Sequence, residues 1–369
     1  LPNSIDLKKL IHTVDKPIFV CGAGESIEDT LKEVPESLIE KCFILAVDAV
    51  VPSLKSMGIK IDAVCALEGQ LAIEKAYIGG GAKKSVLFAD MTSRLQVTRH
   101  SEKVCYFSSK YTDAGFLKRL SEKEFFPPLI PPLGSVGLTA VYIALMLRKN
   151  VNVPVFLSGL DFSFSVGRTH AKNTPAHIAR LCMSGRFSPV ENYAASFRNS
   201  TKKIIAKNKI EVITDAALEN YAKSFTDTFK DMPNLYDCGK QGLLLGLVQL
   251  TSEKLSAYLS TLENEGRLLR FVRNDDGREI RDEIRSFLEG EEKALNRIKE
   301  LLMFGTDVAC CSMSLEEELY ALISPREYLF LHFPDGYKCN IKDLSFLKRV
   351  RSQIDFFLKD IRNELKTEN

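Results

Sequence analysis

The sequence has no excess of charge of either sign and no apolar run long enough to cross a membrane. Its 369 residues carry 50 Lys and Arg against 48 Asp and Glu, a formal net charge of +2 at pH 7. No global basic field therefore favours nucleic acid, and any nucleotide must be held by local groups. The longest apolar stretches, such as Val141 to Leu147, are far shorter than the roughly 20 residues that span a bilayer, and no signal-peptide pattern opens the chain. These absences predict a cytoplasmic protein without a membrane span or a nucleic-acid partner.

The sequence also lacks the spacings that hold a structural metal ion. Its nine cysteines include no Cys-x-x-Cys pair and its five histidines no His-x-x-x-His pair, so a structural zinc site is not expected. Cys21, Cys65 and Cys105 lie in apolar runs typical of buried strands, which favours buried free thiols over disulfides. No Asp-x-Asp motif is present either. We therefore predict that the protein holds no metal and no other cofactor.

What is present, from Pro17 to Ile213, is an alternation of short β-branched runs with longer amphipathic stretches. This alternation is typical of βαβ units that feed a mostly parallel sheet. It predicts an α/β fold, with a Rossmann-like sheet covered by helices on both faces. The predicted strands are Ile18–Val20, Phe43–Val47, Ala63–Leu67, Ser85–Ala89, Val104–Phe107, Val155–Ser158 and Glu211–Ile213.

Two long helices are predicted in the same region, over Ser135–Leu147 and Pro189–Lys207. In the second helix four basic residues would share one side, which favours a solvated basic face over a binding surface for an acidic group. These basic residues are Arg198, Lys202, Lys203 and Lys207.

The character of the chain changes after about Asp237 to long, charged, Leu-rich stretches, which predict a mainly helical second domain. We therefore predict a Rossmann-like domain over residues 1–236 and a helical domain over residues 237–369. The last predicted helix carries one apolar stripe, and packing against the rest of the protein is favoured over a free coiled coil. The stripe consists of Leu347, Val350, Ile354, Phe357 and Ile361.

A glycine-rich turn, Gly22-Ala23-Gly24-Glu25-Ser26, follows the first predicted strand. Such a turn lets the backbone approach a phosphate, while the next helix offers unpaired N–H groups. The pattern is not the dinucleotide fingerprint, because Ile27 takes the place of the third glycine. We predict Gly22, Gly24 and Ser26 as nucleotide-binding residues; the alternative is a tight turn with Ser26 as the helix N-cap.

Acidic side chains follow the next two predicted strands, at Asp48 and Glu68. In doubly wound folds an acidic residue at such a place accepts hydrogen bonds from ribose hydroxyls, so both are predicted to bind the nucleotide, although either could be a helix cap. Gly134 and Ser135 precede the Ser135–Leu147 helix and could hold a second phosphate or a carboxylate. The alternative is that Gly134 and Gly137 allow close helix–sheet packing.

The densest polar cluster is Ser158–Ser163, followed by Gly167–Ala171. A strand would deliver Asp161 to the crevice, and the loop after it would carry Arg168, Thr169 and His170 over the crevice for acid–base work on a substrate. We predict His170 and Asp161 as catalytic residues and Thr169 as a substrate-binding residue. An ordinary loop histidine is the alternative, and His177 is a weaker candidate.

These motifs, in this order, resemble the motility accessory factor family of flagellin glycosyltransferases, whose core is similar to those of bacterial sialyltransferases and hydroxymethylpterin diphosphokinases. The resemblance covers roughly residues 17–180. It rests on the Gly22 turn, Asp48, the Gly-Ser-Val helix start at Gly134, and Gly-x-Asp-Phe at Gly159 with the following Thr-His-Ala at Thr169.

Two positions depart from the family pattern. Glu25 stands where the family usually has Pro, and an anion there is unfavourable beside a phosphate unless it points away. Glu68 replaces an aspartate after the third strand, which alters the reach of that carboxylate. The helical tail carries no motif of the family.

The resemblance implies transfer of a nonulosonic, sialic-acid-like sugar from a CMP-activated donor to Ser or Thr of flagellin. Residues 1–236 would then bind the nucleotide sugar, with His170 or Asp161 as the base for the acceptor hydroxyl. One alternative is a pterin diphosphokinase-like enzyme that holds ATP and Mg²⁺ with Asp48, Glu68 and Asp161. Another is a non-enzymatic flagellin-binding accessory protein, and a methyltransferase or dehydrogenase is less favoured.

Overall fold

The computed structural model describes residues 4–77, 83–111, 114–192, 194–262, 277–304, 313–333 and 338–367. Its internal contacts divide the chain into two compact units. The sheet unit comprises Ser4–Ser109 and Ile130–Arg273, and the helical unit comprises Leu1–Asn3, Lys110–Leu129 and Asn274–Asn369. Residues 237–262 thus belong to the sheet unit, while the functional division into residues 1–236 and 237–369 stays a prediction.

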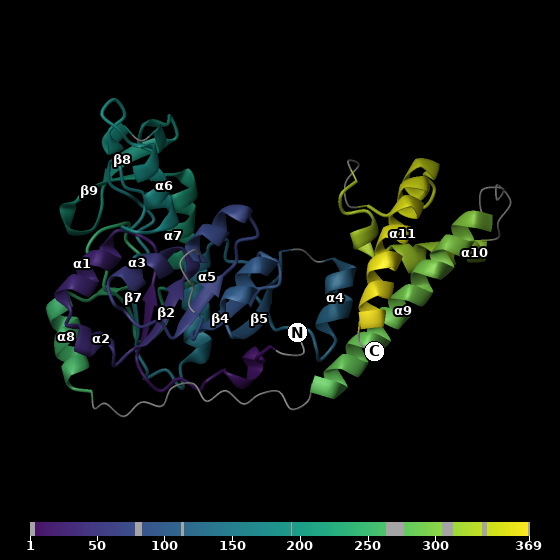
Figure 1. Ribbon diagram of the computed structural model, residues 1–369, viewed down its shortest axis with the longest axis horizontal. Coiled ribbons are helices and arrows are strands. Elements are labelled where there is room, and N and C mark those ends of the chain that lie inside the picture. Colours follow the sequence, from purple (N-terminus) through teal and green to yellow (C-terminus); the bar gives the residue numbers. More distant parts are fainter. Residues whose placement is uncertain are drawn as a thin grey trace. The chain divides into compact units, whose positions relative to one another are not determined.

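A nine-stranded sheet forms the centre of the sheet unit (Figure 1). Ile18 lies beside Phe43 on one side and beside Val155 on the other, and every strand pair of this sheet whose register is described is parallel. The predicted α/β class is therefore confirmed. The order of the strands across the sheet is β11 (Val248–Gln249), β10 (Leu235–Asp237), β7 (Val155–Ser158), β1 (Ile18–Cys21), β2 (Phe43–Val47), β3 (Ala63–Ala66), β4 (Val86–Asp90), β5 (Lys103–Ser109) and β6 (Leu129–Ile130).

The central strands are apolar and buried because helices of the same unit cover the sheet. The helix predicted from Ser135 is confirmed, and Ser135 is its N-cap, accepting from the N–H of Gly137. The cysteines of the central strands are free and buried, also as predicted. The helices of this unit are α1 (Ser26–Glu33), α2 (Glu36–Ile39), α3 (Val51–Ser56), α5 (Val136–Leu147), α6 (Pro175–Met183), α7 (Ala216–Phe229) and α8 (Ser252–Ser260).

The predicted helix over Pro189–Lys207 is wrong. Short 3₁₀ turns occupy its first half, and its second half is strand β8 (Thr201–Ile205), which pairs antiparallel with β9 (Glu211–Asp215). The β-branched residues of this segment pair better across a hairpin than along a helix. Its basic residues therefore do not share one face: Lys203 pairs with Glu211 on the hairpin, whereas Lys207 is buried against Asp237.

The helical unit has a core of its own, in which Val350 and Ile354 of the predicted stripe are fully buried. Glu327 accepts hydrogen bonds from the N–H groups of Gly115 and Phe116 and thereby caps α4. Within the described residues, no helix is both long and apolar enough to span a bilayer. The elements of this unit are α4 (Gly115–Ser121), α9 (Gly277–Phe304), α10 (Met313–Ile323), a 3₁₀ turn (Glu327–Leu329) and α11 (Leu344–Thr367), which packs along α9 (Figure 1).

Candidate functional site

A cleft of about 420 Å³ opens at the carboxyl edge of the sheet, where ligands bind in doubly wound folds. It lies between the turns after β1 and β7 and the first turns of α5 and α7. Six of the ten residues predicted from the sequence line it: Gly22, Gly24, Ser135, Asp161, Thr169 and His170.

The N–H groups of the glycine turn donate to carbonyl groups of the protein itself. The N–H of Gly22 donates to the carbonyl of Ser158 (2.8 Å), and the N–H of Gly24 donates to the carbonyl of Gly159 (2.8 Å). A Cβ atom on Gly22 would lie 2.2 Å from the Gly159 oxygen, and one on Gly24 would lie 2.5 Å from Oδ2 of Asp161. These glycines let the turns after β1 and β7 interlock, and their amides are not free to hold a phosphate.

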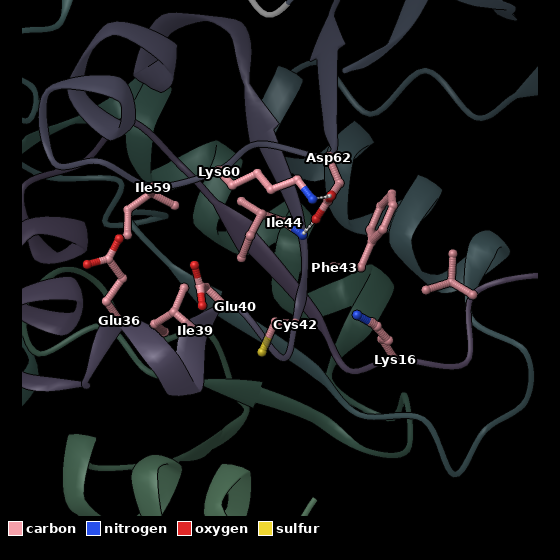
Figure 2. Close-up of a pocket in the computed structure, with 11 residues that line it drawn as sticks. Lys16, Glu36, Ile39, Glu40, Cys42, Phe43, Ile44, Ile59, Lys60 and Asp62 are labelled. Carbon is pink, nitrogen blue, oxygen red and sulfur yellow. Dashed lines mark hydrogen bonds and ion pairs between the residues drawn. The ribbon is translucent and has the colours of Figure 1, made fainter. Parts of the chain in front are cut away.

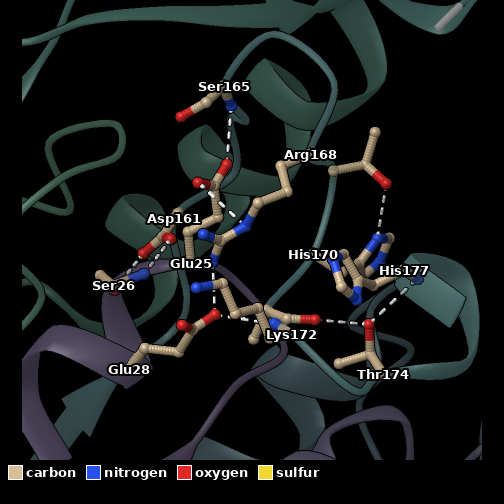
Figure 3. Close-up of polar contacts among 12 residues, drawn as sticks. Glu25, Ser26, Glu28, Asp161, Ser165, Arg168, His170, Lys172, Thr174 and His177 are labelled. Carbon is tan, nitrogen blue, oxygen red and sulfur yellow. Dashed lines mark hydrogen bonds and ion pairs between the residues drawn. The ribbon is translucent and has the colours of Figure 1, made fainter. Parts of the chain in front are cut away.

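The start of α1 is occupied by the carboxylate of Asp161 (Figure 3). Ser26 donates its N–H to Oδ2 over 2.9 Å and its hydroxyl to Oδ1. Ser26 is therefore the first residue of the helix rather than its N-cap. Burial raises the pKa of Asp161 to about 6, against the lowering effect of the Ser26 donors and of Lys207. Asp161 is a fixed anion at this helix end, where a phosphate would be repelled.

Glu25 and Glu28 hold the loop that carries His170 (Figure 3). Glu25 accepts the N–H of Ser165 over 2.7 Å and lies 3.5 Å from the Arg168 guanidinium. Glu28 pairs with Arg168 as well and accepts the N–H of Lys172 over 2.7 Å. Glu25, which stands where the resembled family usually has Pro, thus points to the loop and holds it against α1.

His170 has one ring nitrogen engaged. Its Nδ1 lies 2.9 Å from Oγ1 of Thr169, and among the described residues its Nε2 has no hydrogen-bond partner. Burial lowers the pKa of His170, so the ring is neutral at pH 7. When Nδ1–H donates to Thr169, Nε2 presents a lone pair and can accept a proton. His177 instead accepts the N–H of Asn173 and does not line the cleft.

Four predicted residues do not line the cleft: Ser26, Asp48, Glu68 and Gly134. Asp48 is buried, with Oδ1 accepting the N–H of Ala49 over 2.7 Å and Oδ2 without a hydrogen-bond partner. Burial and, to a smaller extent, the charge of Glu68 raise the pKa of Asp48 to about 7, against the lowering effect of the Ala49 N–H. Glu68 is exposed and accepts the N–H of Gln70. Gly134 has a φ of 74°, which glycine adopts without strain.

The cleft is also lined by residues that were not among the predicted site residues. Arg198 lines it with an exposed side chain that has no ion-pair partner among the described residues. Asp215 lines it too, but caps α7 through the N–H of Leu218 (2.9 Å). The first turn of α5 faces the cleft, with Gly137 packed so closely that a Cβ atom would lie 2.5 Å from Leu160. From the sequence, Arg198 was named only as part of a basic helix face, for which a solvated surface was favoured over binding of an acidic group.

A second cavity, of about 260 Å³, lies at the opposite edge of the sheet, before the first residues of β1, β2 and β3 (Figure 2). Asp62 accepts the N–H of Ile44 there over 2.9 Å and lies 4.0 Å from Lys60. None of the predicted site residues lines this cavity. In the part of the chain that the structure describes, no group of three or more His, Cys, Asp or Glu side chains is placed to hold a metal ion.

Comparison with known proteins finds a family model that is similar to the first part of the chain. Residues 2–167 are similar to the model of the 6-hydroxymethylpterin diphosphokinase MptE-like family. This match confirms the predicted resemblance to hydroxymethylpterin diphosphokinase-like proteins.

Two further proteins are similar over almost the whole chain. An uncharacterized protein of Treponema pallidum (strain Nichols) is 32% identical over 378 residues, which cover 97% of this chain and 64% of that protein. The structure of the MAf glycosyltransferase from Magnetospirillum magneticum AMB-1 matches 98% of this chain and 57% of its own, with a TM-score of 0.49 and 14% identity. The chain thus spans less than two thirds of either protein.

Proposed function

We propose that this chain is a glycosyltransferase that moves a nonulosonic sugar from a CMP-activated donor to a Ser or Thr hydroxyl of flagellin. One observation carries the proposal: a single cleft joins a neutral imidazole, His170, with two features that attract an anion, the start of α5 and Arg198. Transfer from a sugar phosphate needs both kinds of group, a base for the acceptor and donors for the departing phosphate.

The donor phosphate would bind at the start of α5. Free N–H groups and the positive end of the helix dipole attract anions there, and the unpaired guanidinium of Arg198 lines the same cleft. The glycine turn is not available for this role, because the N–H groups of Gly22 and Gly24 are bonded internally. A volume of about 420 Å³ is within the usual range of small-molecule sites.

His170 would act as the base. As the acceptor oxygen bonds to the sugar's anomeric carbon, Nε2 takes the hydroxyl proton, and the bond from that carbon to the phosphate oxygen breaks with its electron pair going to the phosphate. Asp161 is a poorer base, since Ser26 donates to both of its oxygens. Thr169 would fix the imidazole in the tautomer with a free Nε2.

The MptE-like match favours a second candidate, pyrophosphoryl transfer from ATP to a pterin. Its Mg²⁺ would be held by carboxylates, for which the sequence offers Asp48, Glu68 and Asp161. Asp161 is bound to Ser26, and neither Asp48 nor Glu68 lines the cleft. The geometry therefore supports sugar transfer better. The flagellin acceptor and the cytoplasmic location remain predictions.

Thermal unfolding with added nucleotides separates the two candidates. CMP without metal should stabilise the protein, by about 2.7 kcal/mol at 100 times its dissociation constant. Arg198→Ala should weaken this effect, whereas Arg186→Ala, an exposed arginine outside the cleft, should not. Stabilisation by ATP with Mg²⁺ alone would favour the diphosphokinase.

A further inference from the structure

The helical unit contains a groove of about 690 Å³ that is separate from the cleft in the sheet unit. Residues of α4, of α9 and of the turn before Glu327–Leu329 form it. Its walls include charged side chains and one aromatic ring, from Arg119, Glu122, Lys123, Glu124, Glu283, Phe287, Glu291 and Arg326.

Two guanidinium groups share one buried carboxylate at this groove. Oε1 of Glu291 lies 2.8 Å from Nη1 of Arg119 and 3.0 Å from Nη2 of Arg326. Oε2 of the same carboxylate accepts the hydroxyl of Tyr328 over 2.8 Å. Glu291 is 4% exposed and Arg326 is 6% exposed. Both oxygens of Glu291 are therefore engaged, and this one buried carboxylate is shared by two guanidinium groups.

Three N–H-bearing nitrogens of this pair are buried without a hydrogen-bond partner: Nε and Nη2 of Arg119, and Nε of Arg326. The rings of Phe116 and Phe287 lie 5.6 and 5.9 Å from the Arg119 guanidinium, which partly compensates Arg119. None of the described rings is placed over Arg326 in this way. Buried donors in proteins nearly always have an acceptor, so this pair lacks one.

Gly290 keeps the groove open. It lies within α9, where glycine weakens a helix relative to other residues. A Cβ atom built on Gly290 meets nothing within 4 Å, and its φ is not in the left-handed region. Neither packing nor backbone conformation therefore requires a glycine here, whereas any side chain would project into the groove.

We propose that this groove binds a small oxyanion, the carboxylate or phosphate group of a ligand, which accepts hydrogen bonds from Arg326 and Arg119. A planar guanidinium suits either group. The rim of the groove carries three exposed carboxylates, of Glu122, Glu124 and Glu283, and one exposed ammonium group, of Lys123. This acidic rim disfavours a chain of phosphates, so the site selects a ligand with a single oxyanion group.

The test is a titration of the full chain with inorganic phosphate and, separately, with benzoate at constant ionic strength. The NMR signals of the arginine Nε–H groups report binding directly. We expect a saturable shift of the Arg326 signal with a dissociation constant on the order of 1 mM. The tighter of the two probes identifies a phosphate or a carboxylate as the natural group.

Gly290→Leu is the decisive variant, because it fills the groove while improving the helix. It should weaken binding at least about tenfold. Gly185→Leu is the matched control, since a side chain there also meets open space but lies in the sheet unit. Arg326→Gln should abolish the shift of the Arg119 signal, although loss of the Glu291 contact could also unfold the unit. Failure of both probes to saturate, or unchanged binding in Gly290→Leu, overturns the proposal.

Discussion

Two buried aspartates at the carboxyl edge of the sheet, Asp161 and Asp48, differ in their hydrogen bonding. After β1 and β7, Asp161 is buried with donors from Ser26 on both oxygens. After β2, Oδ2 of Asp48 is buried without a hydrogen-bond partner, and Oδ1 accepts only the N–H of Ala49. Both aspartates follow parallel strands and look alike in the sequence. Their hydrogen-bond partners, rather than their positions in the sequence, separate a carboxylate that holds two turns together from one that keeps an unpaired oxygen.

Replacing Asp161 should have the largest effect on stability. Asp161→Ala leaves the N–H and hydroxyl of Ser26 buried without an acceptor and removes the partner of the α1 end, so we expect a loss of roughly 3 to 5 kcal/mol in the free energy of unfolding. Urea denaturation at pH 7 measures it. Asp215→Ala, which removes the N-cap of α7, is the control, at about 1 kcal/mol. An equal loss of unfolding free energy in the two variants would show that Asp161 stabilises the protein no more than an ordinary N-cap does.

Replacing Asp48 should instead raise the free energy of unfolding. Its folded pKa of about 7 lies above the value of about 3.9 in an unfolded chain, so the folded state holds the proton more tightly and stability falls as pH rises between these values. Asn cannot ionise, so Asp48→Asn should be more stable than the wild type by roughly 2 to 4 kcal/mol at pH 8 and by clearly less at pH 5. Unfolding curves at the two pH values test this.

The same variant also tests the role of Asp48 in binding. If Asp48 accepts ribose hydroxyls, as the sequence predicts, CMP affinity must fall in Asp48→Asn while stability rises. If Asp48→Asn is instead less stable than the wild type at pH 8, both oxygens of Asp48 accept hydrogen bonds, as those of Asp161 do.

Replacing Arg168, which pairs with Glu25 and Glu28 and so holds the His170 loop to α1, should have a smaller effect on the free energy of unfolding. Arg168→Ala removes the cation between Glu25 and Glu28, so we expect a loss of about 1 to 2 kcal/mol and faster hydrogen exchange at the N–H groups of Ser165 and Lys172. Lys172→Ala is the control, because only its backbone N–H is engaged by Glu28. Unchanged exchange in Arg168→Ala would mean that the backbone contacts alone position His170.

Much of the sheet could be predicted because its central strands are buried on both faces and therefore read as apolar runs. β2 and β7 match their predicted bounds, and the predicted helix from Ser135 is present. β11 has only two residues, too few to give a pattern. β8 was taken for helix because Arg198, Lys202, Lys203 and Lys207 would share one side of a helix.

The site was harder to predict, because its hydrogen bonds join residues far apart in the chain. The sequence singled out both Ser26 and Asp161 as polar groups near the crevice. It could not show that they bind each other across 135 positions, which turns an expected phosphate site into a closed contact. Likewise, Glu25 was recognised as unfavourable beside a phosphate, but its partners Ser165 and Arg168 become visible only in the folded chain.

The central claim is tested most directly by the rate of sugar transfer from a CMP-linked nonulosonic donor to flagellin, measured across pH for the wild type, His170→Ala and His177→Ala, with CMP affinity in parallel. His170→Ala should lower the rate by roughly 10² to 10⁴ at unchanged CMP affinity, and His177→Ala should change it little. Because burial lowers the pKa of His170 and a base must be deprotonated, the wild-type rate should rise with pH through that lowered pKa and then level off. A wild-type rate in His170→Ala, or a wild-type rate that falls as pH rises through that pKa, would contradict the account.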